Sequence, residues 1–147
     1  YEEVSYDLLP LANQVTPFGF GAIGSLASPM STEQIAREAA ARLSSAVCQV
    51  AGDPSRTHQQ VAVMGGSGSS FIRCASRSGA TLFITADVRY HDAQEAVALG
   101  LDLIILDHFA TERPVLETVG AQLAKRLPDI PVRIATAPST PYSRIPW

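Results

Sequence analysis

Apolar and polar positions alternate in blocks along most of the chain, and the blocks predict strands and helices in turn. Short apolar runs predict strands over residues 47–51, 60–64, 81–85, 101–106 and 132–136. Apolar positions at helical spacing predict helices over about 31–45, 70–77, 91–99 and 111–127. Ser31 and Gln34 form a capping-box signature at the start of the first helix. This order predicts an α/β layered sandwich with a mixed, partly parallel sheet flanked by helices.

The two ends of this pattern are distinctive. Residues 1–18 hold prolines around short β-like segments, and the glycine-rich residues that follow predict irregular structure leading to a short strand. The last predicted helix has an apolar stripe, which we expect to face the core. Its members are Leu116, Val119, Leu123 and Leu127.

The length and the net charge of the chain limit the classes of partner that it could bind. The 147 residues fit one ordinary domain, and a net charge of −3 with mixed signs argues against nucleic acid or an anionic membrane surface as partner. Because neither a membrane span nor a signal peptide is evident, we expect a cytoplasmic protein. The chain begins without Met, so we expect that it is a fragment. Cys48 and Cys74 are expected to be buried, reduced thiols, and His58 to lie at the surface.

Polar residues that could bind a ligand follow three of the predicted strands. Ligands commonly bind where parallel strands end, so these three strand ends are the candidate sites. After the strand over 60–64, Gly65, Gly66, Ser67 and Gly68 offer small side chains and backbone amides that could bind an anion or a carbonyl group. A tight turn from strand to helix explains these glycines equally well. The segment is not a phosphate P-loop, since the Gly-Lys-Ser/Thr motif is missing.

The second strand end places five polar residues in six positions, from Asp87 to Asp92. His91 could act as an acid or base near neutral pH, and Arg89 could bind an anionic substrate. The alternative is that Asp87 caps a turn or helix and the others form a solvated first turn.

The third strand end is Asp107-His108-Phe109-Ala110-Thr111-Glu112. His108 leaves the strand and Glu112 begins the next helix, so their side chains could meet around one cation such as zinc, manganese or iron. The alternatives are a hydrogen-bonded core histidine and a glutamate that complements the helix dipole. Since two ligands seldom suffice, further ligands must come from elsewhere.

These segments together resemble the Nif-three-like dinuclear metal-centre hexameric family, the GTP cyclohydrolase 1 type 2 homologues. The resemblance is to the carboxyl-terminal portion of that family, and it rests on residues 61–72, 83–93 and 107–112. It implies that residues 1–18 close a PII-like insert and that residues 19–147 form the carboxyl-terminal lobe of a two-lobed fold. It also implies a homo-oligomer, a hexamer in the full-length protein.

The resemblance further implies two divalent metal ions, zinc, manganese or iron, held between the lobes. Only His108 and Glu112 carry over as ligands. A metal-dependent hydrolase would open a nucleotide heterocycle such as the guanine ring of GTP, with His91 or Tyr90 moving protons. Gly65, Gly66, Ser67, Gly68 and Arg89 would bind the substrate. The alternative is a non-catalytic metal-binding or regulatory assembly protein.

Overall fold

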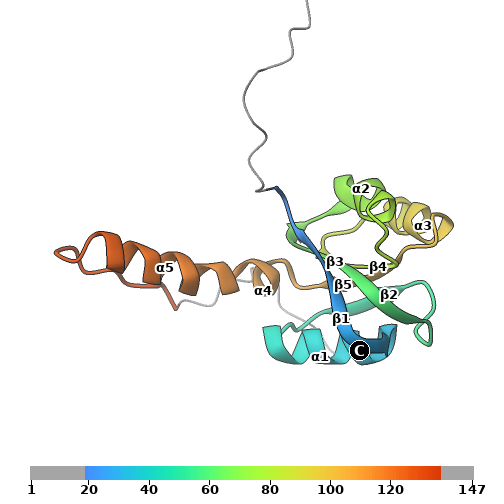
Figure 1. The fold of residues 1–147 in the computed structure, drawn as a ribbon, viewed down its shortest axis with the longest axis horizontal. Helices are drawn as coiled ribbons and strands as arrows, with labels where there is room; N and C mark the ends of the chain where they lie inside the picture. The colour runs from blue at the N-terminus through green and yellow to red at the C-terminus, as the bar shows by residue number, and fades with distance from the viewer. Residues whose placement is uncertain (1–18, 137–147) are drawn as a thin grey trace, which may run out of the picture.

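The computed structural model describes residues 19–136, which form a mixed five-stranded sheet with helices on both faces (Figure 1). The strand order is β1-β3-β4-β5-β2. The central strands β3, β4 and β5 are parallel, and the two edge strands are antiparallel to their neighbours. The predicted fold class is therefore confirmed. The bounds of the strands are β1 (Ala22–Ser31), β2 (Cys48–Ala51), β3 (Thr57–Ser67), β4 (Leu82–Ala86) and β5 (Asp102–Leu106). The segment predicted to close a PII-like insert, residues 1–18, lies outside the described residues.

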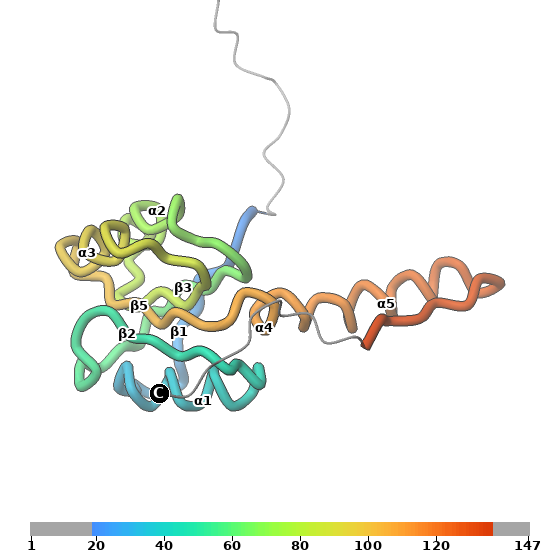
Figure 2. Tube along the Cα trace, turned by 180° about the vertical axis from the view of Figure 1, so that it is seen from behind, coloured from blue at the N-terminus to red at the C-terminus, as the bar shows by residue number. Residues whose placement is uncertain are grey.

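The helices fall into three groups (Figures 1 and 2). Helix α1 covers one face of the sheet, α2 and α3 cover the other, α4 lies against the sheet beside β3, and α5 extends away from it. Their bounds are α1 (Thr32–Leu43), the 3₁₀ turn η1 (Ser69–Phe71), α2 (Ile72–Arg77), α3 (Tyr90–Ala98), α4 (His108–Glu112) and α5 (Pro114–Arg126). No helix in this part of the chain is long and apolar enough to cross a membrane.

Two apolar clusters, one on each face of the sheet, make up the core. Because side chains alternate along a strand, neighbouring residues such as Val61 and Ala62 serve opposite clusters. The cluster under α1 consists of Ile35, Ala36, Val61, Leu82, Ile104 and Leu106. The cluster under α2 and α3 consists of Ala62, Ile72, Ala75, Ala80, Phe83, Ala96, Leu101 and Leu103. With both faces covered, the central strands read as almost continuous apolar runs.

The predicted capping box at the start of α1 is confirmed. The Ser31 hydroxyl accepts from the Gln34 backbone N–H at 3.2 Å, and the Ser31 backbone N–H donates to Gln34 Oε1 at 3.0 Å. Both bonds satisfy amides that a helix start would otherwise leave unpaired.

The predicted helix over 111–127 is wrong in its bounds and in its burial. It is two helices, α4 and α5, and Pro114 occupies the first turn of α5. Its apolar stripe does not face the core, since Leu116 is 41% and Val119 44% exposed. Helical spacing identifies an apolar face but not what covers it, and α5 projects away from the sheet (Figure 2).

The strand predicted over residues 132–136 is absent from the described part of the chain. This segment has no regular structure, and Ile134 lies against Gly120 of α5. A strand needs a neighbouring strand for its backbone hydrogen bonds. The β-prone composition of the segment could not supply one.

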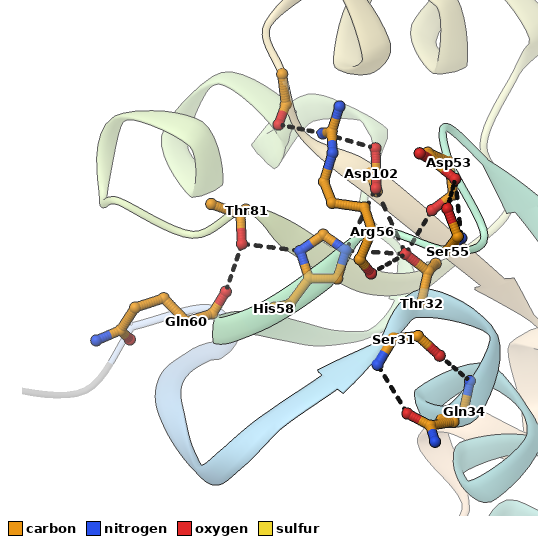
Figure 3. A network of polar contacts seen from close by, with 11 residues as sticks. Ser31, Thr32, Gln34, Asp53, Ser55, Arg56, His58, Gln60, Thr81 and Asp102 are labelled. Carbon is orange, nitrogen blue, oxygen red and sulfur yellow. Dashed lines mark hydrogen bonds and ion pairs between the residues drawn. The ribbon is translucent and has the colours of Figure 1, made fainter.

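A buried polar cluster joins α1, β3 and β5 at the start of β5 (Figure 3). The prediction that His58 lies at the surface is wrong, because the residue is 1% exposed. Its Nε2 lies 2.8 Å from Thr32 Oγ1 and 3.3 Å from Asp102 Oδ2, while Nδ1 lies 2.9 Å from Thr81 Oγ1. Arg56 pairs with the other oxygen of Asp102 at 3.0 Å.

The contacts of the cluster place a proton on Nε2 of His58. The Thr32 hydroxyl donates to the Asp53 carbonyl at 2.8 Å, so it accepts from Nε2–H of His58. Nδ1 lies 2.9 Å from the Thr81 hydroxyl, which also lies 3.5 Å from the Gln60 carbonyl oxygen. Burial lowers the pKa of His58 below its ordinary value of 6.5, while the charge of Asp102 acts in the opposite direction.

The two cysteines are free thiols, but the expectation that they are buried is wrong. Both Cys48 and Cys74 are exposed. Cys48 begins the edge strand β2, and Cys74 lies on α2, so neither sits in the two apolar clusters.

Candidate metal and substrate site

The three predicted strand ends meet at one edge of the sheet. Ser67 of β3 is in register with Ala86 of β4, which is in register with Leu106 of β5. The residues that follow these strands are consequently neighbours, although about 20 residues separate each from the next along the chain.

Helix α4 begins directly after β5 and is fastened at both ends. The Asp107 side chain caps it by accepting from the Ala110 backbone N–H at 3.0 Å. Thr111 donates to the His108 carbonyl at 2.7 Å, and its hydroxyl accepts from the Gly66 backbone N–H at 2.9 Å. The helix is thereby tied to β3.

His108 lies between two carboxylates. Its Nδ1 is 2.5 Å from Asp87 Oδ2, and its Nε2 is 3.0 Å from Glu112 Oε1. His108 and Glu112 are the first and last residues of α4, so they meet as an i, i+4 pair on one helix. The prediction that their side chains meet is confirmed, but Glu112 ends this helix instead of beginning it.

The surrounding charges favour protonated His108. Its hydrogen bond to Asp87 is the main cause that raises its pKa above 6.5, partial burial opposes this, and the Glu112 and Asp87 charges add to it. Its side chain is 43% exposed, so a proton or a cation can reach Nε2 from solvent.

Asp87 belongs to the candidate site through its contact with His108, which the sequence did not indicate. It has a left-handed backbone, with φ of 49°, which is uncommon for a residue other than glycine. Strained backbone of this kind is often found at functional sites. Its position directly after a buried strand, one strand away from His108, was the signal available.

Gly66 leaves the space that Glu112 and His108 occupy. A Cβ at residue 66 would lie 2.5 Å from Glu112 Oε1 and 3.3 Å from His108 Nε2, and its φ of +70° also favours glycine. A Cβ on Gly65 would lie 2.8 Å from the Thr111 carbonyl oxygen. These glycines therefore allow β3 and α4 to approach closely. A tight turn from strand to helix would not by itself require this close approach.

Two donors at this site are of the types that a divalent cation accepts. Nε2 of His108 and Oε1 of Glu112 are the nitrogen and oxygen ligands that zinc, manganese and iron accept. Asp87 holds the other ring nitrogen, as the carboxylate behind a metal-binding histidine commonly does. Asp87 and Glu112 face opposite nitrogens, and no group of three or more such donors converges on one point within residues 19–136.

The remaining predicted residues lie apart from this pair. Tyr90 and His91 begin α3 with their rings edge to face, and His91 Nδ1 contacts Gln94 at 3.2 Å. Arg89 Nε donates to Asp92 at 2.9 Å, and this hydrogen bond is the main cause that lowers the pKa of Asp92. Among the described contacts, none joins these side chains to His108 or Glu112.

Two cavities each include one of the carboxylates that contact His108. One, of about 470 Å³, is polar, and Asp87 belongs to its wall. Its two arginines already pair with carboxylates, Arg73 with Glu95 and Arg89 with Asp92. Its lining residues are Ser67, Ser69, Ser70, Ile72, Arg73, Asp87, Arg89, Asp92 and Glu95. The second, of about 510 Å³, is lined by Gly65, Phe109, Thr111, Glu112, Arg113, Val115 and Leu116.

Comparison with known proteins identifies the family. Residues 4–141 match the family model described as Duf34/NIF3 (NGG1p interacting factor 3). The chain belongs to the DUF34/NIF3 family. The family resemblance drawn from the sequence is thus confirmed.

Relatives and solved structures agree with this assignment. A Bacillus subtilis protein named GTP cyclohydrolase 1 type 2 homolog is 33% identical over 129 residues, which are 88% of this chain and 34% of that protein. A Streptomyces coelicolor protein of the same name is 41% identical over 108 residues, covering 71% of this chain and 38% of that protein. The chain therefore spans little more than a third of the length of these curated relatives.

A solved Bacillus cereus protein, described as related to NIF3, superposes with a TM-score of 0.83 at 30% identity. The match covers 99% of this chain and 41% of that one. The Staphylococcus aureus protein SA1388 gives a TM-score of 0.79 at 26% identity, covering 86% of this chain and 42% of that one. The fold seen here is accordingly that of a portion of longer proteins.

Proposed function

We propose that His108 and Glu112 bind a divalent metal ion and that the protein is a metal-dependent hydrolase acting on a nucleotide heterocycle. The observation that carries the proposal is the Asp87–His108–Glu112 arrangement, in which one ring nitrogen is held and the other faces a carboxylate at 3.0 Å. The name of the curated relatives, GTP cyclohydrolase 1 type 2 homolog, supports the guanine ring of GTP as the substrate group.

Each side chain has a proposed task. Asp87 fixes the His108 ring so that Nε2 points to the ion, and Glu112 supplies the second donor. When bound, the cation supplies Lewis acidity, which makes water acidic enough to act as a nucleophile near neutral pH. Two metal ions need more ligands than these two residues, so we propose that other parts of the assembled protein, a homo-oligomer, provide them.

In this proposal, residues at the neighbouring strand ends bind the substrate and transfer protons. We propose that the segment from Gly65 to Gly68 lies against the substrate and that His91 or Tyr90 moves protons. Arg89 would bind an anionic group with its terminal nitrogens, because Nε is engaged by Asp92. Tyr90 is 74% exposed, so its hydroxyl is accessible to a ligand.

Zinc titration of the chain tests the metal site. We expect weak binding by the wild type, and at least tenfold weaker binding by His108→Ala and by Glu112→Gln, because each removes one donor. Asp87→Asn should lower the affinity about tenfold by releasing the ring. Glu38→Gln on α1 is the matched control and should bind as the wild type does. Equal zinc affinities for the wild type and His108→Ala would refute the proposed metal site. Tight binding of two zinc ions by this chain alone would show that it holds more metal ligands than His108 and Glu112.

Incubation of the full-length protein with GTP, after both metal ions are shown to be bound, tests the reaction. Ring opening is measured as a loss of guanine absorbance and from the mass of the product. If no product forms while the metal is bound, the hydrolase proposal is rejected, and a non-catalytic metal-binding or assembly function takes its place.

A further inference from the structure

The cavity beside α4 has walls suited to a flat organic ring. Its volume of about 510 Å³ lies within the range of about 300–1,000 Å³ that is usual for small-molecule sites. Phe109 forms part of its wall, and the Arg113 guanidinium lies 6.0 Å from the centre of that ring. Aromatic and guanidinium planes are the groups on which proteins stack nucleobases.

Apolar side chains complete the same wall without being covered. Val115 is 57% and Leu116 41% exposed, although both belong to the cavity lining. Apolar surface of this kind is stabilised when a ligand ring displaces water from it. A phosphate group would gain nothing from these two side chains.

The cavity also touches the proposed metal site directly. Glu112 belongs to its wall, and Glu112 Oε1 lies 3.0 Å from His108 Nε2. A ring placed against Phe109 therefore shares its cavity with Glu112, one of the two proposed metal donors.

The second cavity has a different chemistry. Its wall holds three serines, and each of its two arginines pairs with a carboxylate. Hydroxyl groups and paired charges of this type suit the sugar of a nucleoside better than its ring. The segment Gly65-Gly66-Ser67 connects the two, since Gly65 lines the apolar cavity and Ser67 lines the polar one.

We propose that the cavity formed by Phe109, Arg113, Val115 and Leu116 binds the purine ring of a nucleoside, with the sugar directed toward Ser67. The proposal rests on the proposed function, because it names the part of the substrate that each side of the site receives. Phe109 and Arg113 are then the residues that determine specificity for a heterocycle.

Equilibrium dialysis of the metal-free chain with guanosine, and with ribose 5-phosphate as the probe that lacks the ring, tests the proposal. We expect saturable guanosine binding and none of ribose 5-phosphate. Phe109→Leu keeps the apolar volume but removes the aromatic face, so guanosine affinity should fall about tenfold. Phe109→Tyr keeps the face and should stay within about twofold of the wild type.

Three results would overturn the proposal: no guanosine binding at millimolar concentration, unchanged affinity in Phe109→Leu, or ribose 5-phosphate binding as strongly as guanosine. Circular dichroism and thermal unfolding establish that Phe109→Leu is folded, and Phe109→Tyr remains informative if it is not. Measurements of zinc binding distinguish a failure of this proposal from a failure of the proposed metal site. His108→Ala should lose zinc affinity and retain guanosine, whereas Phe109→Leu should do the reverse.

Discussion

A histidine lies beside a carboxylate near each end of β5, His58 of β3 near its start and His108 of α4 after its end, and the two histidines have opposite properties. At the start of the strand, His58 is 1% exposed, and burial lowers its pKa. Beyond its end, the side chain of His108 is 43% exposed, and the hydrogen bond to Asp87 raises its pKa. Burial and the nearby charge of Arg56 lower the pKa of His58, whereas the hydrogen bond to Asp87 raises that of His108.

This contrast separates a structural cluster from a site that can bind ligands. Every polar contact around His58 is with another group of the protein, and the cluster joins the start of α1 to β3 and β5 (Figure 3). Both ring nitrogens of His108 also contact carboxylates, but its side chain is 43% exposed, so a ligand can reach the imidazole from solvent. We therefore expect changes at the first histidine to affect folding and changes at the second to affect binding.

The largest effect is expected at the start of β5. Asp102→Ala removes the buried carboxylate that pairs with Arg56 and lies beside His58, so it should lower the free energy of unfolding by about 2–3 kcal/mol. Glu112→Ala, at an exposed position, should stay within about 0.5 kcal/mol of the wild type. Chemical denaturation of both variants measures the difference, and equal losses would show that the two regions do not differ as proposed.

A smaller effect is expected at Gly66. Gly66→Ala should lower the free energy of unfolding by about 1–2 kcal/mol because of its positive φ, and the added Cβ should push Glu112 away from His108 and weaken zinc binding. Gly79→Ala is the matched control, with a φ of +86° and nothing within 4 Å of the added Cβ. It should cost similar stability and leave zinc binding unchanged. A loss of zinc affinity in both variants would contradict the steric explanation.

The smallest effect is a difference in titration. NMR of the imidazole protons should give a midpoint below 6.5 for His58 and above 6.5 for His108. Because the pKa of His58 is depressed, its contribution to stability is present above pH 6.5 and is lost as the pH falls toward the folded-state pKa. The contribution of His108 is present below pH 6.5 and is lost as the pH rises through its raised pKa. Asp87→Asn should lower the midpoint of His108 only, and a reversed order in the wild type would contradict the assignment.

Local signals in the sequence predicted most of the fold. The capping box of Ser31 and Gln34 was correct because a helix start depends on residues three positions apart. The central strands were found because burial on both faces gives continuous apolar runs. The segment over 132–136 failed because a strand requires a partner that its own composition cannot reveal.

In the candidate site, too, the local contact was predictable from the sequence and the long-range contact was not. The pairing of His108 and Glu112 was predictable, since four positions bring two side chains together on a helix. The contact between Asp87 and His108 was not, because it depends on the register of two parallel strands that are 21 residues apart at this point.

By itself, then, the sequence determined the α/β class, the strand ends that carry the chemistry and the family. Only the tertiary structure decided that His58 is buried, that α5 projects from the sheet and that the apolar cavity lies against Glu112. The physical reason is that periodicity and capping act over a few residues, whereas burial and pKa depend on groups brought together from distant parts of the chain.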